Sequence, residues 1–203
     1  MDTRQAAHTL EVIRTLMERT CQYRLLTAGA SLAAGTLAIL GALAFLFLDA
    51  AYPALFAAVW GFVFASSLTG SFVGTLLRGR EVGERVWTRQ TRMVLLALTP
   101  SLAAAAALTV FFFARGDHLW LPGVWMLCYG QGALATSTYA PSGIRWLGVA
   151  MLALGALTLV LGTGFSVVMM GVAFGLGHLA LGFALLSEER RERAIRLYQR
   201  SVA

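Results

Sequence analysis

An all-α membrane protein, a polytopic bundle of six transmembrane helices, is the fold class that this sequence predicts, and three observations predict it. Of the 203 residues, 58% are hydrophobic and only 13% are charged, whereas about 45–50% of a soluble domain is apolar. The apolar residues gather into six runs, and the basic residues fall between these runs. A chain with this pattern needs lipid as well as water for its solvent.

Each apolar run is long enough to cross a bilayer as one helix, because about 20 helical residues span a hydrocarbon core of about 30 Å. Lipid offers the backbone no hydrogen-bond partner, and a helix satisfies its own backbone within one segment. The runs are too long and too uniformly apolar for barrel strands. We expect spans at residues 25–48, 53–77, 93–114, 119–139, 144–162 and 165–187.

The basic residues predict the orientation of these spans. All 16 are arginines. Fifteen of them lie before the first span, between the second and third, at Arg145, or after the sixth, and only Arg115 falls on the other side. Because cytoplasmic loops carry the excess of basic residues, we expect a bacterial inner-membrane protein with both termini in the cytoplasm. Arginines spread between apolar runs do not form the clustered surface of a nucleic-acid-binding protein, despite the net charge of +6.

The N-terminal segment, residues 1–24, is expected to form a cytoplasmic amphipathic helix. Ala6, Leu10, Ile13 and Met17 recur at i, i+4, i+7 and i+11, which places them on one face. Such a helix with mixed charges can lie on the inner leaflet, pack under the bundle or dock a partner. The transmembrane domain is then 25–187.

The C-terminal tail, residues 188–203, is expected to continue the sixth helix into the cytoplasm. Glu189 with Arg193, and Glu192 with Arg196, have the i, i+4 spacing of helical ion pairs. A solvated helical stub and a partner-binding helix are both compatible with this pattern. Any macromolecular partner is expected on the cytoplasmic side, through residues 1–24, 78–92 and 188–203.

Glycines mark two helix faces that are expected to pack closely against other helices. Gly171, Gly175 and Gly182 share one face of the sixth span, and Gly70 and Gly74 lie on a small-residue surface of the second. Small residues let helix backbones approach in a membrane. A homodimer through such a face is one possible use of them.

His178 is the one strongly titratable side chain well inside an expected span, and it shares the glycine face of the sixth. Ionisable groups at this depth are rare and often functional. In one interpretation His178 makes an interhelical hydrogen bond, with Gln131 or Tyr129 of the fourth span or with Ser66 or Ser67 of the second. In the other it lines a polar cavity and titrates near neutral pH.

Pro100 interrupts the third span. Its ring removes a backbone hydrogen bond and is expected to kink the helix, freeing the carbonyl near Leu96. Thr99 and Ser101 can satisfy such a group. A structural kink and a gating hinge are the two interpretations.

No cofactor, metal or catalytic site is expected. The sequence has no metal-ligand spacing among its histidines and cysteines, which are scattered at His8, His118, His178, Cys21 and Cys128. A membrane haem needs two axial ligands, and only one histidine lies inside a span. No nucleotide-binding loop, nucleophile elbow or zinc-protease motif is present.

Three segments resemble a family of uncharacterised bacterial six-helix inner-membrane proteins. They are Ile13–Arg19, Gly143–Gly148 and Met170–His178. The resemblance implies a six-helix fold and draws attention to Arg19 and His178, but it implies no activity. The long charged tail departs from the short ending typical of that family.

Two hypotheses of function follow. The first is a non-enzymatic membrane module for sensing or assembly, whose cytoplasmic helices engage a cytoplasmic or membrane partner. The second is a transporter or channel for a small molecule or lipophile, with a cavity near His178. A membrane enzyme is a weaker third possibility.

Overall fold

Helices are the only regular secondary structure in the computed structural model, which describes residues 26–83 and 85–202. The prediction of an all-α chain is thus confirmed for these residues. The helix expected at residues 1–24 lies outside them. In chain order the elements are α2 (Ala28–Ala44), α3 (Pro53–Val82), α4 (Arg89–Arg115), η1 (His118–Trp120), α5 (Leu121–Thr136), α6 (Ser142–Leu161), η2 (Thr163–Phe165), α7 (Ser166–Met170), η3 (Gly171–Leu176) and α8 (Gly177–Val202).

Four stretches of the described chain are long and apolar enough to cross a membrane, so the protein is a helical membrane protein. They are Pro53–Glu81, Arg89–Arg115, Ser142–Leu161 and Thr163–Arg191. The other two bundle helices are shorter, with 17 residues in α2 and 16 in α5.

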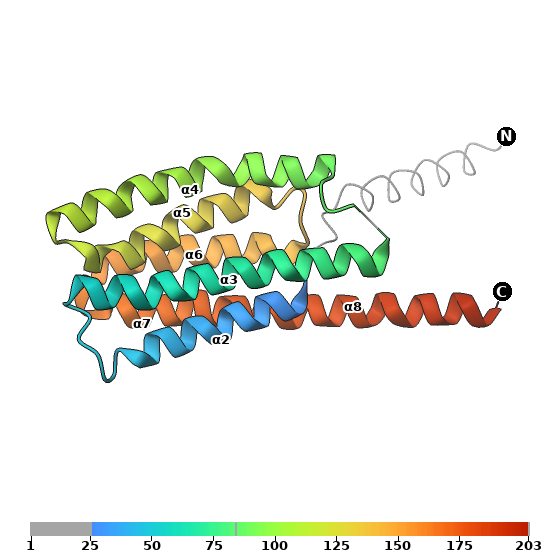
Figure 1. Cartoon of the computed structure of the whole chain (residues 1–203), viewed down its shortest axis with the longest axis horizontal. Coiled ribbons are helices and arrows are strands. Elements are labelled where there is room, and N and C mark those ends of the chain that lie inside the picture. Colours follow the sequence, from blue (N-terminus) through green and yellow to red (C-terminus); the bar gives the residue numbers. More distant parts are fainter. Residues whose placement is uncertain (1–25, 84, 203) are drawn as a thin grey trace.

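Consecutive helices run in opposite directions through the bundle (Figure 1). The last of them is built from α7, η3 and α8, which join end to end and are called the sixth helix below. Its central segment, η3, is a π-helix. Beyond the bundle, α8 continues as a rod toward the C-terminus (Figure 1).

The first helix ends earlier than its apolar run. The run predicts a span to residue 48, whereas α2 ends at Ala44 and the Phe45 N–H bonds back to the carbonyl of Ala42 at 3.2 Å. The apolar residues after it form a turn, in which Phe47 is 91% exposed. Hydropathy records apolar side chains but not the backbone hydrogen bonds that end a helix.

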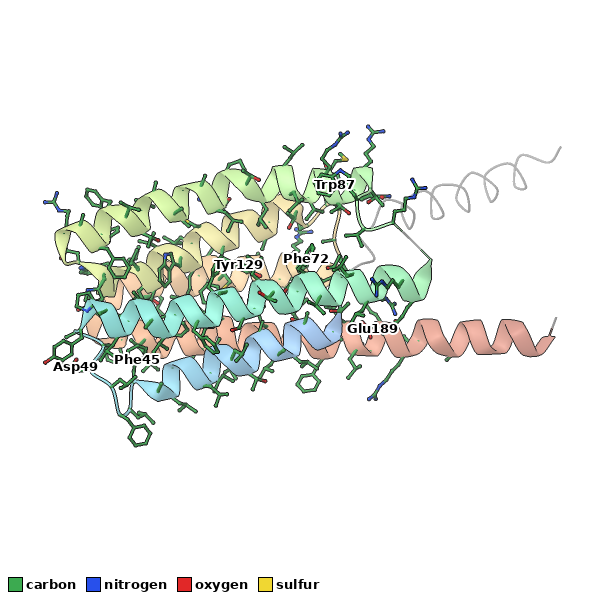
Figure 2. The ribbon with its side chains drawn as sticks, viewed as in Figure 1. Phe45, Asp49, Phe72, Trp87, Tyr129 and Glu189 are labelled. Carbon is green, nitrogen blue, oxygen red and sulfur yellow. The ribbon has the colours of Figure 1, made fainter. Side chains whose placement is uncertain are left out.

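The two ends of the bundle differ in charge. One end, called the arginine end, together with the α8 rod that leaves it, holds every described arginine except Arg115. The arginines at the end itself are Arg78, Arg80, Arg85, Arg89, Arg92, Arg145, Arg190 and Arg191. The other, called the aromatic end, holds Asp49, Arg115 and Asp117 beside buried rings. Figure 2 shows Phe45 and Asp49 at the aromatic end, Trp87 and Glu189 at the arginine end, and Tyr129 between them.

The helices pack in the order α4, α5, α6, sixth helix, α2, α3. α5 lies between α4 and α6, and α2 lies between α3 and the sixth helix. α3 packs mainly along α2, and α4 mainly along α5. Most side chains of α3 and α4 are therefore exposed on the outside of the protein.

Glycines let α5 and α6 touch through their backbones. A methyl group added at Gly130 would lie 2.9 Å from the carbonyl oxygen of Gly148, and one at Gly148 would lie 3.0 Å from that of Gly130. Seven residues away, Gly123 and Gly155 meet in the same way: a methyl at Gly155 would lie 3.0 Å from the Gly123 carbonyl oxygen. The two pairs form the first glycine seam of the bundle.

A second glycine seam joins α2 to the sixth helix. A methyl added at Gly35 would lie 2.7 Å from the carbonyl oxygen of Gly175, and one at Gly171 would lie 2.6 Å from the Cβ of Ala42. Gly182 lies against Leu32, with 2.7 Å between the added methyl and the side chain. The glycine face of the sixth helix thus contacts α2 within the same chain.

The glycines of α3 differ from one another. A methyl at Gly74 would lie 2.6 Å from the Thr27 hydroxyl at the start of α2, but one at Gly70 would meet nothing within 4 Å. α4 passes through Pro100 as a single helix, and the Thr99 hydroxyl donates to the Leu95 carbonyl at 2.7 Å.

Candidate functional site

His178 lies on the sixth helix, two residues after η3 and inside the bundle. Its ring nitrogens both have partners. Nδ1 is 2.8 Å from the carbonyl oxygen of Phe174, and Nε2 is 2.9 Å from the hydroxyl of Tyr129 on α5. A carbonyl oxygen only accepts, so Nδ1 carries the proton. In the neutral ring Nε2 then accepts from the Tyr129 hydroxyl.

The backbone of His178 takes part as well. Its carbonyl oxygen accepts a hydrogen bond of 2.8 Å from the hydroxyl of Ser31 on α2. One residue therefore links three helices, because its ring reaches α5 and its carbonyl reaches α2. We call His178, Tyr129, Ser31 and the Phe174 carbonyl the polar node.

Aromatic rings enclose the polar node. The Phe174 ring stacks on that of His178 with centroids 6.0 Å apart, and it meets the Tyr129 ring edge-on at 5.3 Å. Tyr129 and Phe174 also pack against the main buried apolar cluster, to which Met126, Met151 and others belong.

The node is chemically self-contained. A neutral imidazole has one donor and one acceptor, and both are used within the chain. To exchange a proton or bind a ligand, the ring would have to release Tyr129 or Phe174. In the described part of the chain, no three His, Cys, Asp or Glu side chains lie close enough to hold a metal ion.

Of the expected partners, the structure brings Tyr129 to His178 and places Gln131 elsewhere. Two residues turn an α-helix by about 200°. Gly130 contacts α6 and Gly132 contacts Leu98 of α4, so Tyr129 points inward between these neighbours. Gln131 is exposed on the outside of the bundle.

Ser66 and Ser67 are half-buried on α3, which packs mainly along α2. Among the described residues the hydroxyl that reaches His178 from a neighbouring helix, besides that of Tyr129, belongs to Ser31. Sequence reasoning missed Ser31 because it considered partners for the ring and not for the backbone carbonyl.

A pattern that could have found Ser31 is present in the chain. Ser31, Gly35, Ala38 and Ala42 are small residues three or four apart, which places them on one face of α2. The glycines of the α5–α6 seam were missed too, although Gly123 with Gly130, and Gly148 with Gly155, repeat at seven residues. Such spacing shows that a face is small but does not show which helix it meets.

The aromatic end holds a second histidine, His118, which is 3% exposed. Its Nε2 lies 2.9 Å from the Ala50 carbonyl oxygen, in the loop between α2 and α3. Its ring meets Phe56 edge-on at 5.2 Å and stacks on Phe113 at 5.7 Å. Nearby, the Trp125 indole N–H donates to the Thr109 hydroxyl of α4 at 2.7 Å. These contacts close the aromatic end of the bundle.

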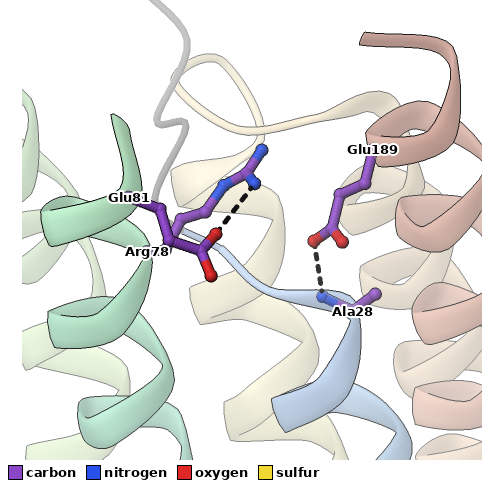
Figure 3. Close-up of polar contacts among 4 residues, drawn as sticks. All are labelled: Ala28, Arg78, Glu81 and Glu189. Atoms are coloured by element: carbon purple, nitrogen blue, oxygen red, sulfur yellow. Dashed lines mark hydrogen bonds and ion pairs between the residues drawn. The ribbon is translucent and has the colours of Figure 1, made fainter. Parts of the chain in front are cut away.

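The arginine end is linked by a carboxylate. The Ala28 backbone N–H at the start of α2 donates to the Glu189 carboxylate of α8 at 3.1 Å (Figure 3). The Thr27 hydroxyl accepts from the Ala30 N–H. In contrast, the Arg78–Glu81 ion pair, 3.6 Å long, stays within α3 (Figure 3). Glu189 thus ties the start of the C-terminal extension to the first described helix.

Comparison of the chain with protein-family models, with curated proteins and with solved structures found no match. The likeness of the three short segments to a six-helix family stays a prediction. Arguments about function rest on the geometry of this chain.

Proposed function

We propose that the protein is a non-enzymatic module of the bacterial inner membrane that binds a partner at its cytoplasmic end, for sensing or assembly. The observation that carries this proposal is the α8 rod, which leaves the bundle as an unbroken helix and carries the charged C-terminal sequence. A helix that continues beyond its own core can serve as a binding element for a partner.

The proposal includes six spans, and packing supports the two short ones. α2 rises about 26 Å over its 17 residues, and η1 with α5 rises about 30 Å over 3 and 16 residues. α5 is enclosed by α4 and α6, and both of these neighbours are long enough to cross a membrane. A helix packed along spanning helices occupies the same layer of the bilayer.

The orientation rests on the arginine end. With the exception of Arg115, every described arginine lies there or on the α8 rod, and the positive-inside rule assigns such an end to the cytoplasm. Both the α8 rod and the loop between α3 and α4 are then cytoplasmic.

Two features of the arginine end favour partner binding. Trp87, in the loop between α3 and α4, is 71% exposed, and exposed tryptophans are enriched among residues that anchor protein interfaces. Glu189 holds the base of the rod against α2. A partner that moves the rod would therefore act directly on the first helix.

A photo-crosslinking amino acid at position 87 tests this proposal in intact cells. The control is position 62, because Phe62 is 66% exposed but lies on α3, toward lipid. We expect an adduct with a second protein species from position 87 and none from position 62. Deletion of residues 192–203 is expected to weaken the adduct. Equal labelling at both positions, or none at 87, contradicts the proposal.

A second candidate function is transport of a small molecule or lipophile past His178. One observation favours it: the π-helical segment η3 ends two residues before His178. Such π turns are frequent at functional sites. If transport occurs, His178→Gln is expected to abolish flux into proteoliposomes while the protein stays folded. The closed hydrogen bonding of the polar node favours the first proposal.

A further inference from the structure

Gln131 is a polar side chain on the outside of a membrane bundle. It lies on α5 between Gly130, which contacts α6, and Gly132, which contacts α4, and its side chain is exposed. It makes no hydrogen bond to a described residue. Its amide therefore faces the surroundings of the protein.

The depth of Gln131 follows from its neighbour. Gly130 lies against Gly148 of α6, which is six residues, or about 9 Å, from the arginine end of that spanning helix. Trp146 of α6, 72% exposed, is nearer this end, at the level where aromatic rings meet the headgroups. Gln131 is five residues, or about 7.5 Å, from the end of α5 at Thr136. Its Cα–Cβ bond tilts toward the start of α5, away from the arginine end, so its amide lies among the lipid tails.

An amide at this depth needs a partner, because lipid tails offer it no hydrogen bond. Two exposed hydroxyls of the bundle avoid the difficulty by bonding to their own helix: Thr36 donates to the Leu32 carbonyl at 2.9 Å, and Thr99 donates to that of Leu95 at 2.7 Å. Gln131 has no such bond to the described residues. Its amide N–H groups and its carbonyl oxygen are therefore available for hydrogen bonds to a second molecule.

We propose that the second molecule is another copy of this chain, bound through the outward sides of α4, α5 and α6 with Gln131 at the centre. Copies in one membrane share an orientation, so a two-fold axis along the membrane normal brings the two Gln131 side chains to the same depth. An amide both donates and accepts, and two identical amides satisfy each other. Polar side chains of this kind join helices in membranes.

Other features fit a homodimer at this surface. The glycine faces of the sixth helix and of α5 are occupied inside the chain, so a second copy has to use a different surface. On α6 the exposed side carries small residues, among them Ala150 and Ala153, which allow close approach. This inference does not depend on the cytoplasmic partner proposed above.

Cysteine crosslinking of the full-length chain in membranes tests the dimer. In a background with Cys21→Ser and Cys128→Ala, Ala135→Cys places a thiol one turn from Gln131 on the same exposed side. Leu68→Cys, on the exposed side of α3, is the matched control. We expect an oxidised dimer from position 135 and none from position 68. Equal crosslinking at both positions, or none at 135, overturns the proposal.

The role of the amide is tested by energy transfer between labelled copies in liposomes of increasing lipid-to-protein ratio. We expect Gln131→Leu to raise the apparent dissociation constant about tenfold or more, because two amide hydrogen bonds are lost. Thr36→Val, on α2 outside this surface and with its hydroxyl bonded to its own helix, is expected to leave it unchanged. A wild-type monomer at every ratio, or a Gln131→Leu variant that dimerises as the wild type does, overturns the proposal.

Discussion

The inner helices of the bundle and its two outer helices, α3 and α4, are all apolar enough to cross a membrane or pack within one, but they are packed differently. A third of the most apolar stretch of α6, and of the sixth helix, is buried within the protein, against 11% in α3 and none in α4. The outer helices instead expose large side chains such as Phe62, Phe72 and Val110. Hydropathy therefore says that a helix lies in lipid but not how much protein covers it.

The glycines of the inner helices and of the outer helix α3 also differ in how closely they are packed. In the inner helices a methyl group at Gly130 would collide with the backbone of the next helix, whereas one at Gly61 or Gly70 of α3 would meet nothing within 4 Å. The residue type is the same, but Gly130 is a packing residue and Gly61 and Gly70 are not. Only the position of a neighbouring helix decides whether a glycine is a packing residue.

The largest expected effect comes from breaking a glycine seam. Gly130→Ala should lower the free energy of unfolding by about 1–3 kcal/mol, because α5 and α6 have to move apart to admit the methyl group. Gly61→Ala makes the same chemical change in open space and should raise stability by about 0.5–1 kcal/mol, because alanine favours a helix more than glycine does. Unfolding in mixed micelles of denaturing detergent measures both. An equal loss in the two variants would contradict the assignment of the seam.

The second-largest loss of stability is expected from disrupting the polar node. Tyr129→Phe leaves Nε2 of His178 without a partner, which should cost about 1–2 kcal/mol of unfolding free energy. Tyr52→Phe is the control, because the Tyr52 side chain is 62% exposed. If Tyr129→Phe unfolds like the wild type, the hydrogen bond does not stabilise the bundle.

The link between α8 and α2 sharpens the comparison at the arginine end. Glu189→Ala removes the acceptor of the Ala28 N–H and should cost about 1 kcal/mol, as loss of a helix N-cap does. Glu81→Ala removes a carboxylate that is 61% exposed and pairs within α3, and ion pairs with such an exposed partner contribute about 0–1 kcal/mol. Hydrogen exchange at Ala28 is the local measurement, and it should speed up only in the Glu189 variant.

The smallest predicted effect concerns Ser31. Ser31→Ala keeps a small residue in the seam and loses one interhelical hydrogen bond, which in a membrane averages about 0.6 kcal/mol. Ser187→Ala is the control, because the Ser187 hydroxyl donates to Ala184 of its own helix. A loss above about 2 kcal/mol for Ser31→Ala would show that the node acts as one cooperative network.

The sequence was sufficient to predict the helices but not to predict which helices pack against one another. Apolar runs predicted membrane helices, since length and composition alone decide whether a segment can cross lipid. Tyr129 and Gln131 were expected at one site because they share a depth, yet they face opposite sides of α5. Which side is inside depends on α4 and α6, and that is a tertiary property. For the same reason the partners of His178 included Ser31, on the described helix most distant from it in sequence.

The π turn of η3 also determines how the residues of α8 that follow it are rotated about the helix axis. A π turn closes its hydrogen bond over one residue more than an α turn does, and each α-helical residue corresponds to about 100° of rotation. Without that extra residue, His178 would face about 100° away from Tyr129. Because α8 is continuous from Gly177 to Val202, the whole rod outside the bundle would rotate by the same angle. The six residues of η3 thus set the rotation of the long helix that follows them.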